Sequence, residues 1–163
     1  MNAAKASAEQ FFQIHVQPTV TQWESSPADI RLAMHAAVSL NQLTDYFWHD
    51  FSDSAPHRVF NTASIKQFRL ELSSRFPNFA LIRDIAESHK HVKLDRSNRV
   101  LTSAEQTSVG TLGYGEAKYG AGTYGGAPEI IIELDSGNRT HFSYVVFNVL
   151  QMWKTLLAIT ASN

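Results

Sequence analysis

The stretch PADIRLAMHAAVSLNQLTDYFWHDF, residues 27–51, decides the fold class because it is the longest amphipathic segment of the chain. Ser25-Ser26-Pro27 supplies a start signal, with serine as N-cap, proline at the first helical position and Asp29 in the first turn. We therefore predict a long helix from Pro27 to Phe51. Its apolar side chains recur three and four positions apart, the spacing of one helix face: Ile30, Ala33, Met34, Ala37, Leu40, Phe47 and Phe51.

Further helices are predicted on both sides of this segment. Upstream, Ala6 to Trp23 has helical spacing, and Pro18 must bend or split that helix because proline cannot donate the interior backbone hydrogen bond. Downstream, Ser64–Phe76 and Phe79–Lys93 are separated only by a break at Pro77-Asn78. Helices joined by so short a connection normally pack antiparallel, so the pattern predicts a bundle.

The C-terminal third of the chain has a different character. Arg99–Val109 is rich in β-favouring residues, residues 110–127 form a Gly/Tyr loop, and Glu129–Leu134 is an Ile-rich strand. A turn then lets Arg139–Phe142 return as the second arm of a hairpin. These features predict a small antiparallel β-hairpin or ribbon within residues 99–142.

The last helix is predicted to start at Ser143, its N-cap, and to run to about residue 160. A helix that is apolar on nearly every side must be central to the core or covered by a second subunit. The expected fold is mainly α: one domain over residues 1–163, with a four- to five-helix bundle at about 6–93 and 143–160 and the β-ribbon inserted before the last helix. The apolar side chains of that helix are Val146, Val149, Leu150, Trp153, Leu156 and Leu157.

The composition limits the class of protein. At 163 residues, 44% of them hydrophobic, the chain suits one domain with a single core. It contains no cysteine, which argues against a disulfide-stapled secreted scaffold and removes every thiolate mechanism. No stretch approaches the roughly 18–20 apolar residues that span a bilayer, and Met1-Asn2-Ala3-Ala4-Lys5 leads into polar residues instead of a signal core. We expect a soluble cytoplasmic protein that is neither exported nor embedded in a membrane.

The net charge of −1 hides an uneven distribution. Residues 61–100 carry eight basic and four acidic side chains, net +4, whereas residues 1–60 carry three basic and six acidic ones, net −3. A basic surface can meet phosphate groups, which dominate the affinity of proteins for nucleic acids. A solvated helix face with ordinary ion pairs is the favoured alternative.

The spacing of glycines and histidines tests for a nucleotide-binding site and for a metal site. Gly120, Gly122 and Gly125 form G-x-G-x-x-G, but a strand follows where a dinucleotide would need the N-terminus of a helix. Of the seven histidines, His35 and His49 share one helix face but lie about 21 Å apart, too far to bind one ion. The sequence therefore predicts no nucleotide cofactor and indicates no metal site, although spacing does not test a three-histidine site assembled from different helices.

The segment with the most chemical content is Arg83-Asp84-Ile85-Ala86-Glu87-Ser88-His89-Lys90-His91. An arginine can hold a phosphate through two parallel hydrogen bonds, and a histidine can move protons near neutral pH. Together they suffice for metal-independent cleavage of RNA through its 2′-hydroxyl. Arg83, five intervening residues and His89, with the polar Asp84 after the arginine, resemble the motif of the HEPN family of small helical proteins. The resemblance covers the helical part of the chain, and it implies a dimer cleft in which Arg83 and His89 bind or cleave RNA.

The geometry of an ideal helix ranks these side chains differently. Arg83 and His89 are about 120° apart, and His89 falls on the apolar face that must pack inward. We therefore expect His89 to be buried or half-buried, and Arg83 to form an outward i, i+4 ion pair with Glu87. His91, about 80° from Arg83, is the better placed histidine for acid–base chemistry.

Two functions of different classes remain. The favoured one is a non-catalytic interaction domain that associates with itself or another protein through the hairpin, the Gly/Tyr loop or an exposed apolar helix face. The alternative is a HEPN-like RNA-binding or RNA-cleaving protein, for which the candidate catalytic residues are Arg83, Glu87, His89 and His91.

Overall fold

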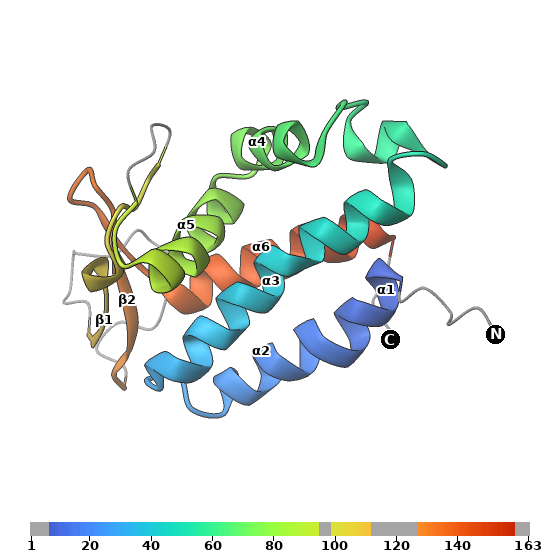
Figure 1. The fold of residues 1–163 in the computed structure, drawn as a ribbon. Coiled ribbons are helices and arrows are strands. Elements are labelled where there is room, and N and C mark those ends of the chain that lie inside the picture. Colours follow the sequence, from blue (N-terminus) through green and yellow to red (C-terminus); the bar gives the residue numbers. More distant parts are fainter. Residues whose placement is uncertain (1–6, 95–98, 112–126, 159–163) are drawn as a thin grey trace.

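The computed structural model describes residues 7–94, 99–111 and 127–158, and it is mainly helical with a small antiparallel sheet before the last helix (Figure 1). The predicted fold class is thereby confirmed. The helices are α1 (Ala8–Phe11), the π-helical turn η1 (Phe12–Val16), α2 (Gln17–Glu24), α3 (Ile30–Phe51), the 3₁₀ turn η2 (Pro56–Val59), α4 (Ile65–Arg75), α5 (Pro77–His91), the 3₁₀ turn η3 (Ala104–Gln106) and α6 (Phe142–Leu157). The strands are β1 (Thr107–Gly110), β2 (Glu129–Glu133) and β3 (Arg139–His141).

The first helix is continuous through Pro18, so of the two predicted effects of this proline, a bend or a split, the split does not occur. The π-helical turn η1 precedes the proline, and within it Gln17 N donates to Phe12 O, five residues back. A wider turn of this kind accommodates a residue that cannot donate to the ordinary i−4 carbonyl. At the other end of this rod, Asp50 of α3 accepts from Ala8 N at 2.6 Å and so holds the start of α1.

Helix α3 lies at the centre of the bundle and contacts α1, α2, α4, α5 and α6. It begins at Ile30, three residues later than predicted, and its N-cap is Asp29 instead of a serine. Asp29 Oδ1 accepts from Arg31 N at 2.9 Å and from Leu32 N at 3.1 Å. A carboxylate is well suited to this position because the N-terminal end of a helix is positively polarised. Ile30 is exposed, and the rest of the predicted stripe is buried or half-buried.

The ends of two other helices also differ from the predictions. Helix α5 begins at Pro77 and ends at His91, because Val92 has a positive φ of 63°. Helix α6 begins at Phe142, and Ser143 does not cap it. The Ser143 hydroxyl instead donates to Glu129 Oε1 at 2.7 Å, which ties the start of α6 to β2.

The sheet has the strand order β1-β2-β3 and is antiparallel throughout. Ile130 and Ile132 of β2 join the hydrophobic core, so one face of the sheet packs on the helices. The predicted hairpin is present as β2 and β3. Of the predicted β segment Arg99–Val109, the residues from Thr107 onward form β1, and η3 precedes them.

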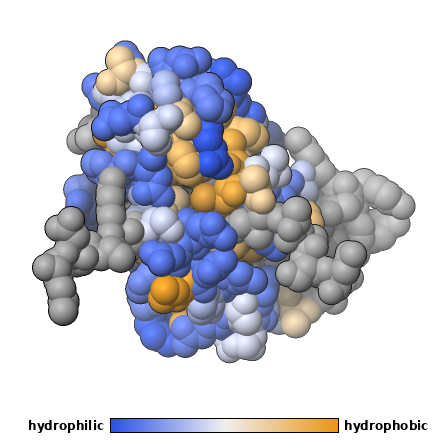
Figure 2. Space-filling view, turned by 90° about the vertical axis from the view of Figure 1, so that its right-hand side faces the viewer, coloured by the Kyte–Doolittle hydropathy of each residue, from blue (hydrophilic) through white to orange (hydrophobic). Residues whose placement is uncertain are grey.

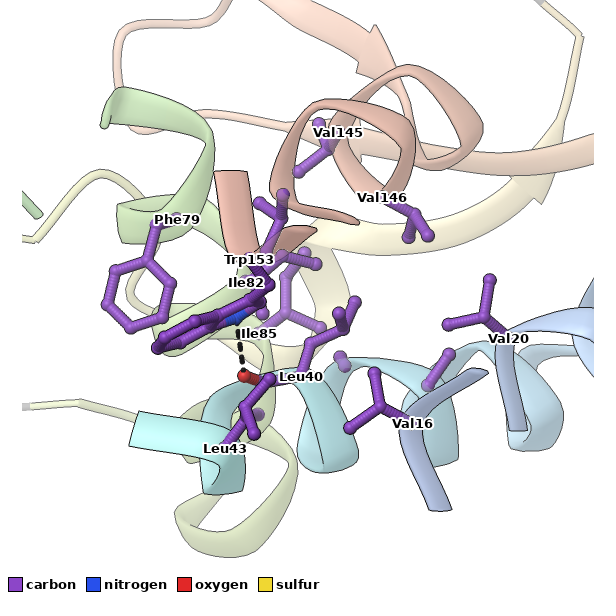
Figure 3. Close-up of a cluster of buried hydrophobic side chains, with 14 of the residues drawn as sticks. Val16, Val20, Leu40, Leu43, Phe79, Ile82, Ile85, Val145, Val146 and Trp153 are labelled. Atoms are coloured by element: carbon purple, nitrogen blue, oxygen red, sulfur yellow. Dashed lines mark hydrogen bonds between the residues drawn. The ribbon is translucent and has the colours of Figure 1, made fainter. Parts of the chain in front are cut away.

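The core is one cluster of buried side chains, to which the six α-helices, the turns η1 and η2 and strand β2 contribute. At its centre Trp153 of α6 is fully buried, and its indole Nε1 donates to Leu40 O of α3 at 3.1 Å (Figure 3). Phe79 of α5 meets the Trp153 ring edge-to-face. In the described part of the chain no helix combines the length and apolar content needed to cross a membrane.

Candidate functional site

The first half of the predicted site on α5 lies inside the protein. Arg83 is 6% exposed and Asp84 is fully buried, as are the apolar residues that flank them. Helix α5 is enclosed because it contacts α3, α4, α6 and η3. A charged side chain in such a place must be paired or hydrogen-bonded.

Asp84 is the centre of this buried group. Its Oδ1 accepts from Arg83 Nε at 2.8 Å and from Arg99 Nη1 at 2.6 Å. Its Oδ2 accepts from two backbone amides, Val100 N at 2.8 Å and Leu101 N at 3.4 Å. One carboxylate thus fixes the chain that enters the sheet region against α5.

The two arginines extend the contacts of Asp84. Arg83 Nη1 donates to Ser73 Oγ of α4 at 2.8 Å. Arg99 Nη2 donates to Glu87 Oε2 at 2.5 Å. We name these five residues the Asp84 network: Ser73, Arg83, Asp84, Glu87 and Arg99. The network joins α4, α5 and the segment before β1.

The predicted ion pair between Arg83 and Glu87 does not form, because each of the two residues pairs with another one. Among the described residues the carboxylate that holds Arg83 is Asp84, and Glu87 holds Arg99. The helix geometry could not reveal this, since Arg99 comes from a segment sixteen residues beyond Arg83.

Arg99 keeps its charge in this environment. Its side chain is only 5% exposed, and burial alone would lower its pKa, but the hydrogen bonds and charges of Asp84 and Glu87 outweigh burial and raise the pKa of Arg99. A base with a raised pKa contributes its stabilisation at every pH below its ordinary pKa. The Arg99 contribution is therefore constant across the neutral pH range.

The second half of the predicted site points into solvent. His89 and His91 are both exposed, so the expected burial of His89 is wrong. Burial along α5 ends at Ser88, and the residues from His89 to Lys93 are exposed. Lys90 and Lys93 are exposed beside them. The structure thus separates the arginine of the candidate site from its histidines by burial.

Most arginines of the basic segment 61–100 bind carboxylates. Arg69 donates to both oxygens of Asp45, at 2.7 and 2.8 Å, and Arg75 donates to Glu71 at 2.7 Å. Arg83 and Arg99 are paired with carboxylates as well. The basic segment therefore agrees with the alternative of ordinary ion pairs and not with a free phosphate-binding surface.

A polar cluster that the sequence did not indicate lies where β3 meets α6. His141 is 4% exposed, and its Nδ1 lies 2.9 Å from Glu129 Oε1 without the N–H direction of a hydrogen bond. Ser143 donates to the same oxygen. Ser143 and His141 therefore both contact the carboxylate of Glu129. Nucleophilic catalysis instead needs the serine hydroxyl beside the histidine ring. The strand register, which no short motif encodes, brings these residues together.

A pocket on the sheet is smaller than a usual ligand site. Residues on the outer side of the sheet, including Ser108, Ile131 and Glu133, line an open pocket of about 160 Å³. Pockets for small molecules are typically about 300–1,000 Å³. Within the described residues no three His, Asp or Glu side chains gather as metal ligands. The three glycines of G-x-G-x-x-G lie outside the described residues.

One face of α6 carries two exposed aromatic side chains. Tyr144 is 41% exposed and Phe147 is 61% exposed, one helical turn apart. No charged residue occurs from Phe142 to Trp153, twelve positions in succession. We name the residues that point away from the core on this helix the outer α6 face: Tyr144, Phe147, Asn148, Gln151 and Thr155.

Hydrophobic surface also gathers at the end of the molecule where α3 finishes (Figure 2). At the end of α3, the Arg58 guanidinium lies 3.7 Å from the centre of the Phe51 ring and donates to Leu156 O at 2.6 Å. These contacts tie η2 to the end of α6, and they account for Arg58 as a packing residue.

The chain matches no family model, and no curated protein or solved structure is similar to it. The resemblance to HEPN proteins stays a prediction from Arg83 and His89.

Proposed function

We propose that this protein is a non-catalytic interaction domain that associates with a second copy of itself through the outer α6 face. The observation that carries the proposal is the exposure of Phe147 and Tyr144 within a helix that has no charge over twelve residues. Protein interfaces are enriched in aromatic side chains and depleted of charges at their centre. Tyr144 and Phe147 are aromatic residues of this kind, and neither is buried in the core.

The Asp84 network supports a non-catalytic role for the α5 segment. Arg83 would have to reach a phosphate in the alternative function, yet its guanidinium is buried and bound to Asp84 and Ser73. Releasing it would leave the Asp84 carboxylate with less compensation in the interior, which is costly. The arginine is better explained as part of the fold.

Sedimentation velocity over a range of concentrations tests the proposal. We expect the wild-type chain to sediment increasingly as a dimer, and Phe147→Glu to weaken the association about thirtyfold or more, as for a residue worth about 2 kcal/mol at an interface. Leu70→Glu is the matched control, because Leu70 of α4 is 48% exposed on a different helix. A wild-type chain that stays monomeric at every concentration, or equal effects of both variants, would reject the proposal.

A second candidate function, binding of RNA, is favoured by one observation. His89, Lys90, His91 and Lys93 are all exposed at the end of α5 and form a local basic surface. Cations at the C-terminal end of a helix also stabilise the helix, which is the simpler explanation.

Binding of single-stranded RNA at low salt separates the two explanations. If RNA is a ligand, Lys90→Ala with Lys93→Ala weakens binding and lowers its salt dependence by about two charges. Lys66→Ala, an exposed lysine of α4, is the control. RNA cleavage without metal that His91→Ala abolishes would establish the enzymatic form, and absence of binding would remove the candidate.

A further inference from the structure

We draw no further inference here: the strongest candidate, the side-chain cluster of Glu129, His141 and Ser143 where β3 meets α6, carries nothing because Ser143 and His141 both contact the Glu129 carboxylate and none of the three lines the pocket on the outer side of the sheet, so that nothing in the described part of the chain points to a ligand for them.

Discussion

The Asp84 network and the outer α6 face reverse the usual distribution of side chains. In the network the side chains of Asp84, Arg99 and Arg83 are only 0, 5 and 8% exposed, so three charges lie in the interior. On the outer α6 face Phe147 is 61% exposed, so a large aromatic ring lies in water. Both arrangements oppose the transfer free energies of the side chains, and each requires a physical explanation.

For the Asp84 network the explanation lies within the fold. For the outer α6 face we look for it in the proposed association. Every charge in the network has a hydrogen-bonded partner of opposite sign, and the backbone amides of Val100 and Leu101 satisfy the second oxygen of Asp84. No contact among the described residues gives Phe147 a comparable role. The network therefore belongs to the fold, and the exposed aromatic residues are the basis of the proposed association.

The largest expected effect is that of Asp84→Asn. It leaves Arg83 and Arg99 buried without their shared counter-charge, so the free energy of unfolding should fall by about 3–5 kcal/mol. Urea denaturation followed by tryptophan fluorescence measures the loss. Asp45→Asn is the control, because its pair with Arg69 is about half exposed and should contribute under about 1 kcal/mol. Equal losses in the two variants would contradict the structural role of the network.

Arg83→Met should have a smaller effect on the same region. Methionine keeps the apolar bulk, and Asp84 retains Arg99 and two backbone amides, so we expect a loss of about 1–3 kcal/mol. Arg31→Met serves as control, since the Arg31 side chain is 68% exposed and should contribute about 0.5 kcal/mol or less. If urea denaturation shows that Arg83→Met is as stable as the wild type, the structural role of Arg83 is contradicted and a functional role becomes the better explanation.

Val92→Gly should stabilise the protein by about 1 kcal/mol, since a β-branched residue at positive φ is strained and glycine is not. Val92 has φ 63°, and Lys93 N donates to His91 O across it at 2.7 Å. Val109→Gly is the control: Val109 is also exposed, but it lies in β1, where glycine should destabilise. Thermal unfolding of both variants decides the sign, and destabilisation by Val92→Gly would contradict the strained turn.

The smallest effect on stability is predicted for Phe147→Glu. In dilute solution its free energy of unfolding should stay within about 0.5 kcal/mol of wild type, because the fold leaves this ring in water. Phe142→Ala, at a buried phenylalanine of the same helix, should instead cost about 3–5 kcal/mol. A large loss for Phe147→Glu at low concentration would show that Phe147 belongs to the core.

The helices were predictable because their apolar spacing is local information. Phe68 and Leu72 of α4 and Leu40 of α3 are buried as their spacing indicates. The helix starts were less predictable, since Ser26 and Asp29 both suit an N-cap and only the final packing selects Asp29.

The candidate site was predictable in composition and not in environment. The sequence indicated that Arg83 to His91 holds unusual polar content, but Arg83 is buried and its partner Asp84 also binds Arg99, and no local rule links these residues. The same limit applies to His141 and Glu129, which the strand register brings together. The exposed face of α6 was predictable in part, because a helix apolar on nearly every side was expected to be either central to the core or covered by a second subunit.

The most direct test of the central claim is the thermal midpoint of unfolding as a function of protein concentration. Association of folded chains stabilises them by mass action, so the wild-type midpoint should rise by about 3–8 °C over a hundredfold increase in concentration. The midpoint of Phe147→Glu should stay constant and equal that of dilute wild type. A constant wild-type midpoint, or a Phe147→Glu midpoint that is lower at every concentration, would contradict the assignment of the outer α6 face to association.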